Sequence, residues 1–383
     1  MLPAPAVWAG SLLGCVTLIP ILIGPIIVGV LVDYGGLSDT QAGVTAGYSA
    51  IGSVSAALVC ALNMHRLPLR RLAIGGLLLA MIVNVLAALS LDHLSLFYGL
   101  RALAALGEGM AYAAVMSSFA RYSDSERCYG LFMMLQFGIA GVALWALPTF
   151  APTMSATTLY LGFAGVQLLV LPAAFSLPAS AADTAGVSIR GSEWRLLLAV
   201  PAVAGLVALC FSEASNIGTD AYLERIAVHT GLSDAQIGRT LGLASILGMP
   251  GAFAILFLGG RLGHATPALI GFAIGSGSLI GILKADSYAT FFLFVCIHSV
   301  AWAFVTPYIQ SILADLDPGG AVVTAGGIAS GLGAGLGPAA TGAMVSANNY
   351  SGVMTTGLVA FAVAAIAILI AAFGLSGRTT ATN

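Results

Sequence analysis

Two charged side chains lie inside one apolar segment of this chain, at positions 101 and 108. Arg101 keeps its charge at physiological pH, and its planar guanidinium can bind a carboxylate through two hydrogen bonds. Glu108, near the middle of the segment, carries a carboxyl group that can hold and release a proton. Tyr112 follows one turn later, so helical spacing places all three side chains on one face. Charges at this depth are costly and usually mark ion or substrate pathways.

The Arg101–Glu108 pair has two interpretations. In the first, Arg101 binds an anion and Glu108 carries a proton. In the second, Arg101 neutralises Glu108 and the pair fixes helix packing. Their separation corresponds to roughly 10.5 Å of rise along a helix. That rise does not suit a direct bond within one helix and favours separate functions.

Other polar and aromatic residues in apolar segments are candidates for lining a substrate cavity. Glu213 is either a second proton-coupling carboxyl group or the solvated end of its segment. His298 is either a protonatable group or a hydrogen-bond partner of a neighbouring helix. Trp302 and Tyr308 follow it and either contact a ring-bearing substrate or pack between helices. Gln136 is an amide in a further apolar segment.

The elements that position these residues are membrane spans. Hydrophobic residues make up 59% of the 383 positions, and charged residues only 7%. A soluble domain is about 25% charged. The apolar runs are roughly 18–25 residues long, enough to cross a ~30 Å hydrocarbon core. This composition excludes a soluble globular protein, a disordered chain and a nucleic-acid binder. The 48 glycines favour closely packed helices over a β-barrel.

We count twelve apolar runs, each predicted to be a transmembrane helix. They fall at 8–32, 41–62, 72–90, 95–118, 129–150, 157–177, 196–214, 236–258, 265–283, 288–312, 321–346 and 353–374. If the N-terminus is cytoplasmic, nine Lys and Arg residues flank the spans inside and three outside. Cytoplasmic loops carry the excess of basic residues, so both termini are predicted to be cytoplasmic.

An internal repeat divides the chain. The stretch 36–47 matches 231–242 at eight of twelve positions, and the offset of 195 is about half the chain length. Residues 38–41 and 233–236 both have the S-x-x-Q pattern of a helix capping box. We therefore predict an all-α membrane protein of two six-helix bundles, at 1–177 and 196–383, joined by a cytoplasmic linker at 178–195.

Motifs for catalysis, metals and nucleotides are missing. The five cysteines form no CxxC, and there is no Walker A, HExxH or Gly-x-Ser-x-Gly sequence. Gly327, Gly331 and Gly335 fall four apart in an apolar run, which indicates close helix packing and not a nucleotide fingerprint. We expect no enzyme activity, no cofactor and no metal.

The twelve runs, the repeat and the central linker resemble the major facilitator superfamily over essentially the whole chain. The family's signature after span two has the form G-x-x-x-D-R-x-G-R-R, and Arg66 and Arg70 match it, whereas its acidic position is His65. Arg261 occupies the equivalent place in the second half. The resemblance implies gating functions for these three arginines and alternating access to a central cavity. It also implies that span five, with Gln136, lies nearer the cavity than span three.

The segment 101–109, RALAALGEG, is similar to the R-x6-E pattern in span four of the superfamily's organic-anion:proton symporters. That branch also has an acidic residue in span one, which is absent here. We therefore expect a monomeric secondary transporter of the bacterial inner membrane that moves a small organic anion together with a proton. The alternative is proton-coupled efflux of hydrophobic or drug-like compounds. The residues expected to bind substrate are Arg101, Tyr112, Gln136, His298, Trp302 and Tyr308, and those expected to carry protons are Glu108 and Glu213.

Overall fold

The computed structural model is helical throughout the residues that it describes. These residues are 5–63, 68–119, 125–150, 154–177, 179, 197–258, 263–316, 321–345 and 349–380. The helices of the first half are α1 (Pro5–Leu22), α2 (Gly24–Asp33), α3 (Asp39–Asn63), α4 (Leu69–Ala88), α5 (Leu94–Phe119), α6 (Ser125–Phe150) and α7 (Ala156–Val170), with a 3₁₀ helix, η2 (Leu171–Ser176). Those of the second half are α9 (Val200–Asp220), α10 (Leu223–His229), α11 (Asp234–Leu258), α12 (Ala265–Leu283), α13 (Tyr288–Leu316), α14 (Ala321–Ala343) and α15 (Ser351–Thr380).

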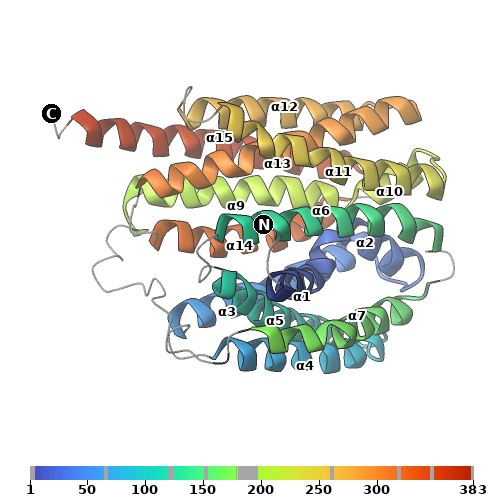
Figure 1. The fold of residues 1–383 in the computed structure, drawn as a ribbon. Helices are drawn as coiled ribbons and strands as arrows, with labels where there is room; N and C mark the ends of the chain where they lie inside the picture. The colour runs from blue at the N-terminus through green and yellow to red at the C-terminus, as the bar shows by residue number, and fades with distance from the viewer. Residues whose placement is uncertain are drawn as a thin grey trace.

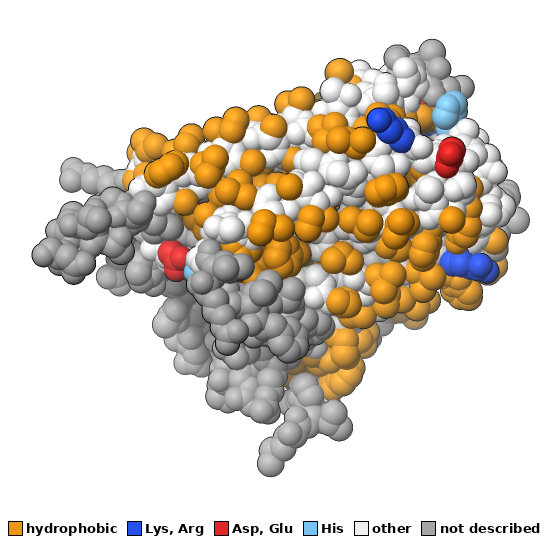
Figure 2. Space-filling view, turned by 90° about the horizontal axis from the view of Figure 1, so that it is seen from above, with side chains coloured by type: hydrophobic (Ala, Val, Ile, Leu, Met, Phe, Trp, Pro, Cys, Tyr) orange, Lys and Arg blue, Asp and Glu red, His pale blue; other side chains and the backbone are white. Residues whose placement is uncertain are grey.

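The helices have the length and surface of membrane spans. Within the described ranges, nine are long and apolar enough to cross a bilayer, and 24–33 and 134–148 form shorter apolar helices. Large hydrophobic side chains such as Leu169, Ile366 and Phe373 are exposed on the surface. Figure 2 shows one face of the molecule, on which hydrophobic side chains are widespread and charged ones are few. The prediction of a helical membrane protein is confirmed.

Two predicted spans have different boundaries in the structure. The run 8–32 is not one helix, because α1 ends at Leu22 and α2 begins at Gly24. Pro25 explains this break, since proline lacks an N–H and its ring clashes with the preceding turn. The run predicted to end at 214 continues to Asp220 as α9. The polar residues after 214 remain helical because neighbouring helices bury most of them.

Two sets of helices are arranged side by side (Figure 1). In the first set, α5 packs against α3 and α4, and α4 also contacts α7. In the second set, α9 packs against α14 and α15, and α13 lies between α11 and α12. Two long contacts join the sets, α3 with α14 and α6 with α11. We call the helices from α1 to η2 the first set and those from α9 to α15 the second set.

The glycines of α14 allow its close approach to α3. A Cβ at Gly335 would overlap Ala50 of α3, and one at Gly331 would lie 3.1 Å from Val54. The predicted packing function is therefore confirmed for these two glycines. Gly327 has no such contact, because a Cβ there meets open space.

Both predicted capping boxes form. In each, the serine N–H donates to the glutamine Oε1 and the glutamine N–H donates to the serine Oγ, at 2.8 and 3.2 Å in 38–41 and at 3.0 and 3.4 Å in 233–236. Gly36 and Gly231 precede the boxes with φ of +69° and +80°, a conformation that favours glycine. The boxes start α3 and α11 at one end of the molecule, which we call the capping-box end.

Candidate functional site

A buried polar network joins α4, α5 and α7. Its members are Asn84 on α4, Arg101 and Glu108 on α5, and Gln167 on α7, none more than 5% exposed. Nε2 of Gln167 donates to Oε1 of Glu108 at 2.9 Å. Nδ2 of Asn84 reaches the same oxygen at 3.3 Å and Oε1 of Gln167 at 3.1 Å. One oxygen of the buried carboxyl group therefore accepts hydrogen bonds from two neutral amides.

Arg101 joins this network through Asn84. Its Nη1 donates to Oδ1 of Asn84. Its Cζ lies 5.1 Å from the centre of the Tyr160 ring, which is a cation–π contact. Among the described residues, the ion pairs do not include one between Arg101 and Glu108. Asn84 bridges the two charges, and each charge has its own uncharged partners.

The three residues expected to share a face of α5 have different surroundings. Arg101 and Glu108 contact residues of α4 and α7, inside the first set of helices. Tyr112 is half-buried, and its ring centre lies 6.0 Å from that of Phe132 on α6. Asn84 therefore links Arg101 to Glu108, whereas Tyr112, expected on the same face of α5, contacts α6.

A second buried carboxyl group lies in the second set of helices. Glu213 of α9 is 5% exposed, and its Oε1 accepts a hydrogen bond from Thr306 of α13 at 3.4 Å. The indole of Trp302, one turn earlier on α13, lies beside this carboxyl group. Glu213 is therefore not at a solvated helix end, because α9 continues beyond it and α13 covers it.

His298 is buried on α13, one turn before Trp302. Its Nδ1 lies 3.3 Å from the hydroxyl of Ser278 on α12, and the ring contacts the backbone of Asn216 on α9. The ring centre is 6.4 Å from that of Phe361 on α15. His298 thus connects helices within the second set, as the hydrogen-bond alternative requires.

Helix α9 carries further buried polar residues near Glu213, which sequence reasoning missed. Ser212, Ser215, Asn216 and Thr219 are all at most 1% exposed. Ser215 donates to the carbonyl oxygen of Gly357 on α15 at 2.8 Å. The signal was present as a polar run after Glu213, but in sequence it resembled the solvated end of a span.

The two remaining candidates for substrate contact also differ in exposure. Tyr308 is fully buried, with its ring centre 5.1 Å from that of Phe304 and 6.5 Å from that of His264. Gln136 is half-buried on α6. Tyr308 therefore has the surroundings of a packing residue, and Gln136 is the more accessible of the two.

The structure describes one of the three predicted gating arginines, Arg70. Arg70, at the start of α4, donates from Nε to the carbonyl oxygen of Leu177 at 3.0 Å. This contact attaches the first turn of α4 to the end of η2 within the first set. Arg66 and Arg261 lie outside the residues that the structure describes.

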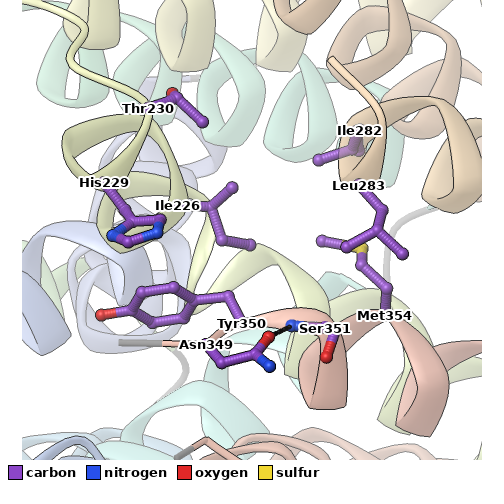
Figure 3. Close-up of a pocket in the computed structure, with 9 residues that line it drawn as sticks. All are labelled: Ile226, His229, Thr230, Ile282, Leu283, Asn349, Tyr350, Ser351 and Met354. Atoms are coloured by element: carbon purple, nitrogen blue, oxygen red, sulfur yellow. Dashed lines mark hydrogen bonds between the residues drawn. The ribbon is translucent and has the colours of Figure 1, made fainter. Parts of the chain in front are cut away.

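A surface pocket of about 290 Å³ opens between α10, α12 and the start of α15. Figure 3 shows the His229 and Tyr350 rings on one side of it and Leu283 and Met354 on the other. None of the residues predicted from sequence to bind substrate lines this pocket.

The long apolar helices and the buried charges define a multi-pass helical membrane protein. Comparison with known proteins identifies the family to which this membrane protein belongs. The family model "Major Facilitator Superfamily" matches residues 9–330. Since the match covers most of the chain, the protein belongs to this superfamily, and it is a secondary transporter that works by alternating access.

Solved transporters share the fold at low sequence identity. A bacterial homologue of the human lysosomal transporter Spinster, in an inward-facing and unoccupied conformation, has a TM-score of 0.75 and 14% identity, covering 97% of this chain and 96% of that one. A D-xylose–proton symporter has a TM-score of 0.75 and 14% identity, covering 93% and 95%. The nucleoside transporter NupG has a TM-score of 0.73 and 12% identity, covering 97% and 99%. No curated protein matches the sequence.

Proposed function

We propose that the protein couples the movement of a proton to that of a small organic anion, a carboxylate, across the bacterial inner membrane. The observation that carries the proposal is the network around Glu108. Two neutral amides hold its carboxyl group, and Asn84 connects it to Arg101. The structural likeness to a D-xylose–proton symporter supports proton coupling.

The proposed architecture is the one expected from sequence. Twelve spans form bundles at 1–177 and 196–383, the linker 178–195 is cytoplasmic, and the transporter is a monomer. The matching capping boxes of α3 and α11 support the repeat. The basic residues near the span ends support cytoplasmic termini.

Charge balance explains how the network would couple two solutes. In the empty state a deprotonated Glu108 and a charged Arg101 offset one another through Asn84. Protonation of Glu108 removes the negative charge and leaves Arg101 without compensation in a medium where charges interact strongly. A carboxylate would restore the balance by binding the guanidinium. Because Tyr160 and Asn84 enclose Arg101 in this structure, anion binding belongs to a state in which they have moved.

Two substitutions separate the proposed functions of the pair. Arg101→Lys should abolish stabilisation of the purified protein by carboxylates, since an ammonium lacks the planar fork. Glu108→Gln should keep this stabilisation and carrier exchange but lose uphill uptake driven by a pH gradient, because the amide cannot release a proton. A Glu108→Gln variant that still concentrates solute would exclude Glu108 as the proton carrier.

The probes are a panel of small monocarboxylates, tested by thermal denaturation and then by uptake into proteoliposomes. Glu213→Gln is the matched control, because it neutralises the second buried carboxyl group in the same way. If Glu213→Gln loses uphill uptake and Glu108→Gln does not, the proton carrier is Glu213 on α9.

A second candidate function is proton-coupled efflux of hydrophobic or drug-like compounds. It is favoured by Glu213, whose carboxyl group lies beside the indole of Trp302. An acid next to an aromatic ring suits a lipophilic cation. Stabilisation by lipophilic cations, lost in Glu213→Gln and retained in Glu108→Gln, would favour efflux over anion symport.

A further inference from the structure

An ion pair joins the two sets of helices at the capping-box end. Nη1 of Arg225, on α10 of the second set, lies 2.6 Å from Oδ1 of Asp33, at the end of α2 in the first set. Nε of Arg225 is 3.7 Å from Oδ1 of Asp39, at the start of α3. The exposed fraction of the side chain is 13% for Arg225, 19% for Asp39 and 38% for Asp33, so water screens the Arg225–Asp39 contact less than a surface pair.

Uncharged hydrogen bonds position the two sets beside this ion pair. The hydroxyl of Tyr222, just before α10, donates to the carbonyl oxygen of Asp39 at 2.8 Å. The hydroxyl of Thr40 donates to the carbonyl oxygen of Gly342 on α14 at 3.0 Å. Tyr222 is fully buried. The end of α9 and the end of α14 therefore both contact the start of α3.

The surroundings of Arg225 are strongly acidic. Glu224 and Asp234 belong to the second set, and they face Asp33 and Asp39 of the first. Burial raises the pKa of the Tyr34 phenol, and the carboxylates of Asp33, Asp234 and Glu224 raise it further. In the described part of the structure, Asp33 and Asp39 have Arg225 as their one basic partner in an ion pair. Without it, acidic groups on the two sets would repel each other.

Tyr350 borders the same group of charges. Its pKa is raised by burial and then by Asp39, and lowered by Arg225. Tyr350 also lines the pocket in Figure 3, where its ring centre lies 5.7 Å from that of His229. The titratable groups that face Arg225 thus come from α2, α3, α10, α11 and the turn before α15.

We propose that Arg225 is a positioning residue for alternating access, which holds the capping-box end closed by bridging Asp33 and Asp39. Its charge decides whether the facing surfaces of the two sets attract or repel. When the sets separate at this end, Arg225 loses both carboxylates and the acidic groups become solvated. The bridge therefore stabilises the state closed at this end relative to the state open there.

A further acidic group of the second set lies beside this bridge. The carboxyl group of Glu224 on α10 lies against Gly29 of α2, close enough that a Cβ at position 29 would overlap it. A carboxyl group of the second set therefore contacts the first set next to Arg225.

The test measures the distance between the sets with spin labels. Asp92, between α4 and α5, and Asp286, between α12 and α13, are both exposed and lie at this end on opposite sets. Labels at these positions, in a variant without native cysteines, report opening by pulsed electron resonance. Arg225→Ala should raise the population with the longer distance by about fivefold, the effect of a partly buried ion pair. Arg239→Ala, which removes an exposed arginine near the start of α11, should leave the distances unchanged.

A charge exchange distinguishes gating from a structural function. Arg225→Asp alone should open this end more than Arg225→Ala, and Asp33→Arg in the same chain should restore the short distance. High salt should lengthen the distance in the parent protein but not in Arg225→Ala. If Arg225→Ala is poorly folded, Arg225→Lys should give an intermediate shift. Unchanged distances in Arg225→Ala, or no rescue by the exchange, would overturn the proposal.

These measurements need no substrate and no proton gradient. Their outcome is therefore independent of whether Glu108 carries protons or Arg101 binds anions.

Discussion

Asn84 shows how one neutral side chain can connect two charges that its own helix does not carry. It accepts a hydrogen bond from Arg101 and donates one to Glu108, although both belong to α5 and Asn84 to α4. Within α5 the two charged groups are separated by about two turns. The amide therefore gives the buried guanidinium and carboxyl group a common partner. An apolar residue at this position of α4 would not.

Loss of this amide should destabilise the protein strongly. Asn84→Leu keeps the volume but removes the acceptor for Arg101 and a donor to Glu108, leaving two buried charges with fewer partners. We expect a loss of about 2–3 kcal/mol, the cost of removing buried hydrogen bonds to charged groups, measured by thermal denaturation in detergent. Gln136→Leu makes the same change at a half-buried amide and should cost much less. Equal melting temperatures for the two variants would contradict the bridging function.

Part of this site could be predicted from sequence. Arg101 and Glu108 were identifiable because charges are rare in the apolar segments. Asn84 and Gln167 were not placed with them, because which helices adjoin α5 is a tertiary property. Sequence also gave no way to tell a polar residue that lines a cavity from one buried between helices of one bundle, as Glu213 and His298 show.

At the scale of elements, α14 contacts helices of both sets through glycines on opposite faces. Gly331 and Gly335 face α3, and a Cβ at Gly333 or Gly337 would overlap backbone atoms of α9. The four-residue spacing of the first pair was readable from sequence. The second face was not, because it depends on the rotation of α14 against α9. The break after α1 was missed, although Gly24 and Pro25 mark it in the sequence.

A pair of glycine substitutions on α14 tests this packing. Gly335→Ala should cost about 1–3 kcal/mol, because the added methyl group overlaps Ala50 and forces α3 and α14 apart. Gly327→Ala adds the same group in open space and should be neutral, or stabilising by up to about 1 kcal/mol from helix propensity. Thermal denaturation of the two purified variants gives the comparison. A larger loss in Gly327→Ala would mean that the α3–α14 contact is misplaced.

At the scale of the whole molecule, composition alone excluded a soluble protein, and the repeat predicted a family that the comparisons confirm. The number of spans and the boundaries of the two bundles stay predictions. Sequence could not show which end of the two sets is held together, because that depends on contacts between segments about half a chain apart. The capping boxes predicted where α3 and α11 begin, but not that the start of α3 contacts α10.

Topology follows from the distribution of basic residues. A reporter fused after Asn383 should be active as a cytoplasmic fusion, and one inserted near Gly35 should be active in the periplasm. Paired alkaline phosphatase and fluorescent protein fusions measure both positions. The reverse pattern would place the Arg225 bridge at the cytoplasmic surface and invert the assigned orientation.

The small residues of α14 have a kinetic consequence. Toward α3 the helix presents Gly331, Gly335 and Ala339, so small residues form this part of the contact. When the two helices separate at these three positions, no side-chain rotamer of α14 has to rearrange, and the contact loses only short-range dispersion. Such an interface has little internal friction. The free-energy barrier between the two states should then depend on the polar contacts at the ends of these helices. A change confined to a few atoms at one end can therefore set the turnover rate of the whole transporter.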